Sequence, residues 1–236
     1  MKHDWRWMLC LGALALVGAP HAGAAAPARV AMKGVHYVYL IRHGAYDPEP
    51  ALGDLQGGAL NALGRDQVRL AGRRLAKLPV RFDTLVTSPF RRARESAAEI
   101  GRCLHREAAV DPDLHECTPT ADRADFMKNH GAADVAACDS TLALAWARWC
   151  VPSPEADRHD LLVCHANVIR WFVSRAVAGD PRRWPGFEIA NASLTILAVH
   201  ADGTVRLATY SDTGHLPLSR QTWTGAGAGW RSAGRK

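Results

Sequence analysis

The sequence predicts an α/β fold, a three-layer sandwich in which helices cover both faces of a mostly parallel central sheet. Short apolar runs rich in β-branched and aromatic residues alternate along the chain with longer segments that carry helix-start signals. Such alternation is typical of parallel strands connected by helices. The 236 residues, 48% of them hydrophobic, provide enough apolar surface for one sizeable domain.

The N-terminus has the three parts of a secretory signal. Lys2 and Arg6 are basic, residues 7–17 form a short apolar run, and residues 22–24 are small. We therefore expect residues 1–24 to be a signal peptide that is cleaved after residue 24. The mature protein would then be periplasmic or secreted, without stable membrane insertion. The alternative is that the segment stays uncleaved as an amphipathic anchor.

Five strands and four helices are predicted within a domain that we assign to residues 25–220. The strands are expected at 35–41, 83–87, 158–164, 193–199 and 205–210. The helices are expected at 62–77, 89–104, 141–149 and 168–178, with Asn61 and Ser88 as N-caps. A polar loop is predicted at 44–58, a loop-rich segment with one or two short helices at 107–137, and a flexible tail at 221–236.

Three strand-to-helix junctions carry polar side chains that are suited to chemistry. The first strand is followed by residues 42–44 (Arg-His-Gly), the second by 88–92 (Ser-Pro-Phe-Arg-Arg) and the third by 165–167 (His-Ala-Asn). Ligands of parallel sheets bind beyond the carboxyl ends of the strands. We therefore expect two arginines and two histidines to surround one cleft.

Basic residues crowd the first turns of the helix that is predicted after residue 88. Arg91, Arg92 and Arg94 oppose the positive end of the helix macrodipole. Arg91 has Glu95 as an i,i+4 partner, whereas Arg92 has no acidic residue at that spacing. A phosphate near the helix start would resolve this conflict, because guanidinium groups match phosphate oxygens with paired hydrogen bonds.

His43 is placed to act as a nucleophile. The neighbouring charge of Arg42 favours the neutral imidazole, since a second positive charge nearby is disfavoured. The neutral ring has a free lone pair for attack on phosphorus. Gly44 permits a close backbone approach, and its carbonyl can hold the ring in one tautomer.

These motifs resemble the signature of the histidine phosphatase superfamily, which includes the cofactor-dependent phosphoglycerate mutases. The resemblance covers about residues 35–220 and is closest to the mitochondrial serine/threonine protein phosphatase branch. It rests on LIRHG at 40–44, LNALGRDQ at 60–67, SPFRRA at 88–93, VCHANVIR at 163–170, NASLT at 191–195 and DTGH at 212–215.

The resemblance implies a role for five residues. His43 would be the nucleophile that becomes phosphorylated, while Arg42, Arg92 and His165 would hold the phosphoryl oxygens. Glu116 would be the general acid, and a carboxyl in such a site should have a raised pKa. The resemblance implies neither a cofactor nor a metal ion.

Two departures from the family pattern narrow the expected reaction. The family often has a polar residue and an asparagine shortly after the RHG motif, whereas residues 45–48 of this chain are Ala-Tyr-Asp-Pro. This difference argues against a mutase. His165 is followed by Ala166 where the acid phosphatase branch has aspartate, so the acid must come from elsewhere. We therefore expect a phosphomonoester hydrolase, with phosphoserine or phosphothreonine in proteins as one substrate class. The alternatives are an exported sugar-phosphate or envelope phosphate phosphatase, and an inactive phosphate-binding module.

Two other kinds of site compete with this interpretation. Two histidines and a carboxylate can bind zinc, but Arg42 and Arg92 would repel a metal ion. Cys164 and Arg170 have the C-x5-R spacing of thiolate phosphatases. That loop usually needs glycine to wrap around phosphate, and residues 165–169 contain none.

Charge and cysteine content set the remaining expectations. The net charge of +6 suits a phosphorylated partner, and no motif indicates nucleic-acid binding. The resemblance also implies a homodimer. Removal of the signal would leave five cysteines, with Cys103–Cys117 and Cys138–Cys150 as pairings between which the sequence does not choose.

Overall fold

The computed structural model describes residues 34–223 of the 236-residue chain. The expected signal peptide at 1–24 lies outside the described residues, and so does the tail from residue 224 onward. The domain limits at residues 25 and 220 therefore stay predictions.

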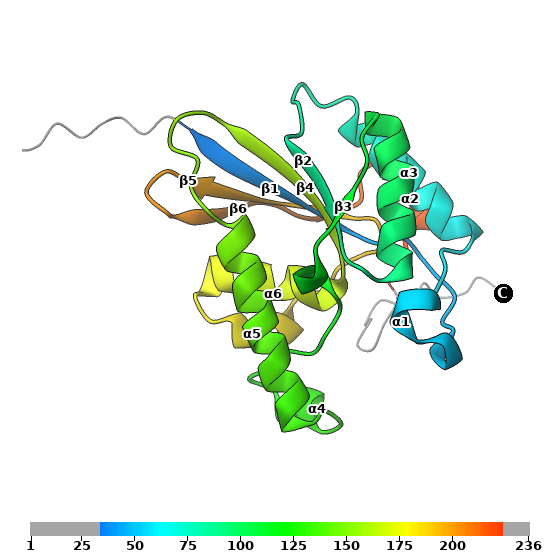
Figure 1. Ribbon diagram of the computed structural model, residues 1–236, viewed down its shortest axis with the longest axis vertical. Helices are drawn as coiled ribbons and strands as arrows, with labels where there is room; N and C mark the ends of the chain where they lie inside the picture. The colour runs from blue at the N-terminus through cyan, green and yellow to red at the C-terminus, as the bar shows by residue number, and fades with distance from the viewer. Residues whose placement is uncertain (1–33, 224–236) are drawn as a thin grey trace, which may run out of the picture. The chain divides into compact units, whose positions relative to one another are not determined.

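A six-stranded sheet forms the centre of the domain, with the order β3-β2-β4-β1-β5-β6 (Figure 1). Four strands are parallel to one another, and β5 and β6 run antiparallel at one edge, so the predicted mostly parallel sheet is confirmed. The strands are β1 (Val35–Arg42), β2 (Thr84–Thr87), β3 (Ala109–Val110), β4 (Arg158–Cys164), β5 (Leu194–His200) and β6 (Val205–Asp212).

Helices cover both faces of this sheet, as the sandwich prediction requires (Figure 1). The helices are α1 (Gly53–Gln56), α2 (Ala62–Leu75), α3 (Arg91–Leu104), α4 (Ala124–Met127), α5 (Ala132–Trp149) and α6 (Ala166–Ala178). Of these, α2 and α3 pack on one face of the sheet and α5 and α6 on the other. Short 3-10 turns occur at Pro50–Leu52, Pro112–Leu114, Pro181–Gly186 and Leu218–Arg220. Within residues 34–223, no helix has both the length and the apolarity that crossing a bilayer requires.

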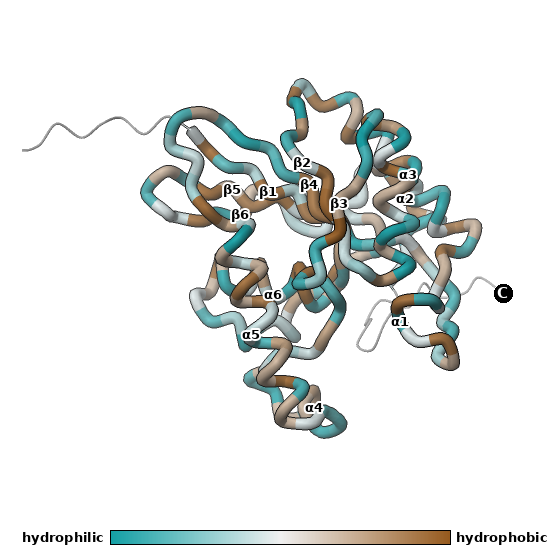
Figure 2. The backbone as a smooth tube through the Cα atoms, in the orientation of Figure 1, coloured by the Kyte–Doolittle hydropathy of each residue, from teal (hydrophilic) through white to brown (hydrophobic). Residues whose placement is uncertain are grey.

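The alternation of side chains along the central strands divides the core into two layers. Val38 and Leu40 of β1 face the cluster that contains α5 and α6. Tyr39 and Ile41 point the other way, into the cluster that contains α2 and α3. Because both faces of these strands are buried, the strands read as continuous apolar runs, which Figure 2 shows as brown segments in the middle of the fold.

The register of the parallel strands brings the three polar junctions to one level. Arg42 at the end of β1 pairs with Cys164 at the end of β4, and Thr87 at the end of β2 pairs with Val163. The next residues along each strand therefore emerge side by side at one edge of the sheet. These residues are His43, Ser88 and His165.

The middle of the chain is more regular than predicted. Helix α5 begins at Ala132 instead of residue 141, because small helix-favouring residues continue the helix in the N-terminal direction. Within that extension Val135 and Cys138 are buried one turn apart. Strand β3 was missed because it is two exposed residues long and shows no apolar alternation.

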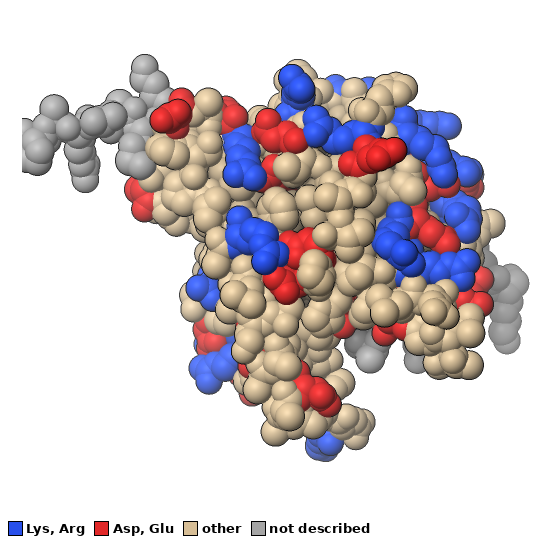
Figure 3. Space-filling view, viewed as in Figure 1, with Lys and Arg blue, Asp and Glu red and all other residues tan. Residues whose placement is uncertain are grey.

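Basic side chains gather over the α2–α3 side of the domain and alternate there with acidic ones (Figure 3). Glu99 of α3 pairs with Arg69 of α2 at 3.1 Å and with Arg102 at 2.6 Å. Arg91 and Glu95 form the expected i,i+4 pair at 2.8 Å. The arginines of these two helices therefore serve partly to connect them.

Candidate active site

The residues predicted to form the site meet in one cavity. A cavity of about 240 Å³ is lined by Arg42, His43, Arg92 and Glu116. His165 lies beside it, with its ring centroid 5.1 Å from that of His43. Segments that are more than one hundred residues apart in the sequence thus converge as expected.

The imidazole of His43 is buried and held in one tautomer. Its Nδ1 donates to the carbonyl oxygen of Gly44 at 2.8 Å, which leaves a lone pair on Nε2. A Cβ atom at Gly44 would lie 2.5 Å from the carbonyl oxygen of Gly64, so this turn requires glycine. Burial and the charges of Arg42 and Arg92 hold the pKa of His43 well below its usual range. The ring is therefore neutral and oriented for attack.

Arg42 brings a buried positive charge to the same cavity. One guanidinium nitrogen, Nη1, donates to the carbonyl oxygen of Ile189 at 2.6 Å. Burial lowers the pKa of Arg42 to about 10, while the carboxylate of Glu116 opposes this decrease. The group stays protonated at neutral pH and can bind a phosphoryl oxygen.

His165 is positioned by a residue that the sequence did not single out for this purpose. Its Nε2 lies 2.7 Å from the hydroxyl oxygen of Ser88, and burial is the main cause that lowers its pKa. The predicted N-cap role of Ser88 is wrong, because α3 begins only at Arg91 and its N-cap is Phe90, whose amide donates to Ser88 Oγ at 3.3 Å. Adjacent parallel strands β2 and β4 explain why Ser88 and His165 meet.

Two aromatic rings and one carboxylate surround Arg92. The guanidinium carbon lies 4.8 Å from the ring centroid of Tyr46 and 5.1 Å from that of Phe90. Its Nη1 donates to Asp54 Oδ1 at 2.5 Å. Arg92 has no acidic residue at the i,i+4 spacing, as the sequence indicates, and its acidic partner Asp54 reaches it from α1, a contact that helix spacing cannot indicate. Tyr46, which also contacts the His43 ring edge-on, was likewise not predicted.

Asp54 occupies a guanidinium donor of Arg92 that would otherwise be available to an anion in the cavity. The side chain of Asp54 is 58% exposed, whereas that of Arg92 is 5% exposed. We expect Asp54→Asn to lower the inhibition constant of inorganic phosphate and the KM by up to about fivefold, the range of a partly exposed ion pair. The kcat should change little, because the reacting groups stay in place.

Steady-state kinetics with phosphate as a competitive inhibitor measure this effect. Glu49→Gln is the matched control, since Glu49 lies 3.8 Å from Arg91 and does not contact Arg92. A weaker phosphate affinity in Asp54→Asn would show that the carboxylate supports binding by orienting Arg92.

The carboxylate of Glu116 reaches from the loop after Leu114 to the first turn of α6, which begins directly after His165. Its two carboxylate oxygens accept hydrogen bonds from the amides of Ala166 at 3.1 Å and Asn167 at 3.0 Å. Burial raises the pKa of Glu116, although Arg42 and the amide of Asn167 act in the opposite direction. A carboxyl with a raised pKa beside a phosphate site suits the donation of a proton.

Several buried nitrogens around the cavity lack a hydrogen-bond partner among residues 34–223. They include Arg92 Nε, His165 Nδ1 and Arg170 Nε. A buried donor without a partner costs about 1–3 kcal/mol. An oxyanion in the cavity would satisfy donors of this kind, which supports anion binding here.

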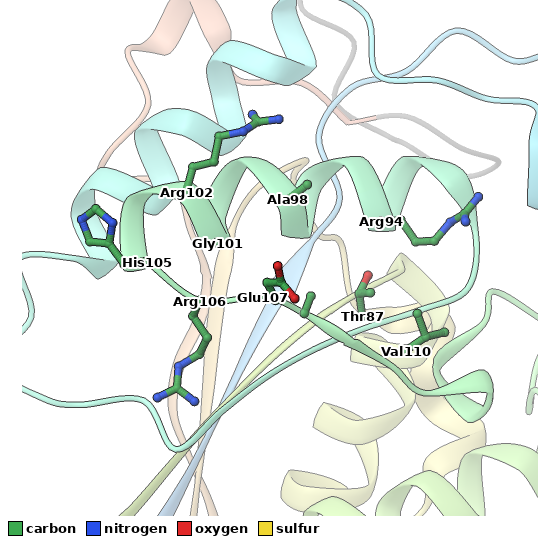
Figure 4. Close-up of a pocket in the computed structure, with 10 residues that line it drawn as sticks. Thr87, Arg94, Ala98, Gly101, Arg102, His105, Arg106, Glu107 and Val110 are labelled. Atoms are coloured by element: carbon green, nitrogen blue, oxygen red, sulfur yellow. The ribbon is translucent and has the colours of Figure 1, made fainter.

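A larger cavity elsewhere is not a candidate for the same chemistry. It has a volume of about 520 Å³ and lies between α3 and β3, bounded by Arg94, Gly101, His105 and Val110 (Figure 4). None of the five predicted site residues lines it. In the described part of the chain, no three His, Cys, Asp or Glu side chains are grouped so that they could hold a metal ion.

Neither of the two disulfide pairings that the sequence left open forms. Cys117 is bonded to Cys138, while Cys103 and Cys150 are free thiols. The reason is that the loop after Leu114 passes over the N-terminal half of α5, a region that the sequence left as loop.

The thiolate phosphatase alternative is also excluded by geometry. Cys164 is the last residue of β4 and is fully buried. Burial raises the pKa of its thiol, so the thiolate needed for attack is not formed at neutral pH.

Comparison with known proteins agrees with this geometry. The sequence profile of the histidine phosphatase superfamily (branch 1) matches residues 38–122 and 143–213. The chain belongs to the histidine phosphatase superfamily. Together with its relatives, which are named phosphatases, this membership identifies the chain as a metal-independent phosphatase that acts on phosphomonoesters.

Curated relatives are about 31% identical to this histidine phosphatase over the aligned residues. The human mitochondrial serine/threonine-protein phosphatase PGAM5 is 32% identical over 201 residues, which are 80% of this chain and 67% of the relative. The Caenorhabditis elegans Pgam5 is 31% identical over 194 residues, 79% of this chain and 66% of the relative. The match thus spans about two thirds of the relatives' length.

Solved structures share its fold. A phosphoglycerate mutase from Plasmodium falciparum has a TM-score of 0.55 and 22% identity, covering 78% of this chain and 96% of its own. A mycobacterial glucosyl-3-phosphoglycerate phosphatase with inorganic phosphate has a TM-score of 0.55 and 24% identity, covering 77% and 99%. The phosphoglycerate mutase-like fold that the sequence predicted is therefore confirmed.

Proposed function

We propose that His43 is the residue that accepts the phosphoryl group of the substrate. The observation that carries this proposal is the hydrogen bond from His43 Nδ1 to Gly44, which leaves Nε2 free in a cavity lined by guanidinium groups. Arg42, Arg92 and His165 bind the phosphoryl oxygens. Phosphoryl transfer requires mainly positioning and charge neutralisation, which these groups supply.

The reaction has two steps. In the first, His43 Nε2 forms a bond to phosphorus while the bond from phosphorus to the ester oxygen breaks and Glu116 gives that oxygen its proton. In the second, the ionised Glu116 takes a proton from water, whose oxygen displaces His43 and releases inorganic phosphate. The enzyme returns to its starting protonation state.

The two shifted pKa values predict the pH dependence of kcat/KM. Activity requires neutral His43, so it rises with pH through a pKa that lies well below the usual value for histidine. It also requires protonated Glu116, so it falls as pH rises through a pKa above the usual value for glutamate. We expect an optimum on the acidic side of neutrality.

A pH series of kcat/KM for wild type and Glu116→Gln checks this assignment. The substrate phosphate titrates equally in both, so the decline at higher pH should disappear only where Glu116 is replaced. An unchanged decline in the variant would assign that ionisation to another group.

We propose phosphoserine or phosphothreonine in proteins as the substrate class. Support comes from the relatives, which are named serine/threonine-protein phosphatases and are about 31% identical to this chain. The test ranks phosphoserine, phosphothreonine and phosphotyrosine peptides, sugar phosphates and nucleotides by kcat/KM. Phosphopeptides should rank first, and a leading sugar phosphate would favour a small-molecule phosphatase.

We also propose that the enzyme works in the periplasm or outside the cell, which keeps an exported sugar phosphate as the second substrate class. The signal pattern of residues 1–24 supports export. The Cys117–Cys138 disulfide supports an oxidising compartment. Cell fractionation should recover a shortened chain outside the cytoplasm, whereas a full-length cytoplasmic chain would contradict export.

The resemblance further leads us to propose a homodimer. Analytical ultracentrifugation of the mature chain measures its mass in solution. A species of twice the chain mass is expected, and a monomer at all concentrations would contradict the proposal.

A further inference from the structure

The residues around Glu116 form a loop without regular secondary structure. We call residues 115–120 the acid loop. Its carboxylate is fixed by the amides of Ala166 and Asn167 at the start of α6. The side chain of Asn167 also donates to the carbonyl oxygen of Cys117 at 2.9 Å. The acid thus depends on a backbone that forms no strand or helix of its own and is held in place by contacts from other elements.

Helix α5 holds the other side of the acid loop through two consecutive residues. Cys138 forms the disulfide with Cys117, the residue next to Glu116. Asp139 accepts hydrogen bonds from the amide of Thr120 at 3.0 Å and from its hydroxyl at 2.6 Å. Of these attachments, the disulfide is covalent and lies nearest to the acid.

Cys138, the α5 residue that forms the disulfide, is itself held in place by packing. Cys138 is 2% exposed and packs in the same core cluster as Leu142 and Trp149 of that helix. The disulfide therefore connects the acid loop to the hydrophobic core. A displacement of about 1 Å in a catalytic group can lower a rate about a hundredfold, so such an attachment affects proton transfer directly.

The phosphate-binding groups do not share this dependence. Arg42 and His165 lie at the ends of β1 and β4, and Arg92 lies in the first turn of α3. Their positions follow from the pairing of β1, β2 and β4 and from the core cluster around α2 and α3, which contain neither Cys117 nor Cys138. Loss of the disulfide should therefore separate proton donation from phosphate binding.

We infer that the Cys117–Cys138 disulfide is a positioning element for the general acid, and that protonation of the leaving group depends on the oxidised pair. This inference rests on the proposed role of Glu116. Reduction by a dithiol delivers two electrons and two protons, gives two thiols and leaves the dithiol as a cyclic disulfide. Reduced enzyme keeps its phosphate site and loses part of its acid catalysis.

Leaving-group dependence distinguishes this role from general stabilisation. Phosphoserine leaves as an alkoxide that needs a proton, whereas p-nitrophenolate leaves without one. General acid catalysis contributes about 10²–10⁴-fold. The variant Cys117→Ser/Cys138→Ser should lose about 10–100-fold in kcat on a phosphoserine peptide and less than about threefold on p-nitrophenyl phosphate.

The experiment measures both substrates with the full oxidised chain, the double variant and dithiothreitol-reduced wild type. Cys103→Ser and Cys150→Ser are the controls, because these free thiols lie outside the site. The inhibition constant of inorganic phosphate reports the phosphate site and should stay unchanged. If the double variant does not fold, the reduced wild type at low temperature makes the same comparison.

The outcomes separate the inference from the proposed function. Equal losses on both substrates, weaker binding of inorganic phosphate, or no loss on the phosphoserine peptide would overturn the positioning role while wild-type activity stands. Inactivity of the oxidised wild type on both substrates would instead contradict the proposed function itself.

Discussion

Replacing His43 with alanine is expected to lower kcat about 10⁴-fold or more for every phosphomonoester, because removal of a covalent nucleophile has effects of this size. The ring is buried and its Nδ1 is occupied by Gly44, so it contributes a single reactive nitrogen to the cavity. Neither Arg42 nor Arg92 can replace it, since guanidinium groups stay protonated. The loss should be the same for aryl and alkyl phosphates.

Single-turnover and steady-state assays with p-nitrophenyl phosphate and a phosphoserine peptide measure this loss. His200→Ala is the matched control, since this partly exposed residue ends β5 and is not among the residues that line the cavity. Orthovanadate should still bind the His43→Ala protein through the arginines. Substantial turnover by the variant would show that another group is the nucleophile.

Replacing Glu116 with glutamine has the second largest expected effect. The amide keeps the size of the carboxyl and one acceptor for the amides of Ala166 and Asn167, but it cannot donate an acidic proton. We expect kcat for a phosphoserine peptide to decrease about 10²–10⁴-fold. For p-nitrophenyl phosphate, whose leaving group needs no proton, the decrease should be much smaller.

A series of aryl and alkyl phosphates with graded leaving-group pKa measures this dependence. The slope of log kcat against leaving-group pKa should become steeper in Glu116→Gln than in wild type. Glu107→Gln is the control, because Glu107 lines the separate cavity beside α3. A uniform loss across the series would indicate that Glu116 serves to hold α6 in place instead.

The parts of the fold that follow from the sequence are those with a strong local pattern. Strands β1 and β4 are buried on both faces, so each contains a continuous apolar run that predicts a strand. If these strands are parallel neighbours, His43 and His165 must lie close together, because each directly follows the carboxyl end of its strand. The site was therefore predictable from strand ends.

Contacts between segments with weak patterns were not predictable in this way. The carboxylate of Asp54 reaches Arg92 from a four-residue helix within a predicted loop. The disulfide joins Cys117 to Cys138 because α5 extends further toward the N-terminus than its few large apolar residues indicate. Both contacts depend on tertiary placement of loops, which hydrophobic periodicity does not encode.

The covalent intermediate gives the most direct test of the account. The enzyme is mixed with a phosphopeptide whose phosphate is radiolabelled and is denatured in alkali within milliseconds. The peptide of the enzyme that carries the label is then sequenced. We predict acid-labile, base-stable phosphate on His43, and none in the His43→Ala protein. Label on His165 or Cys164, or a phosphate that survives acid, would contradict it.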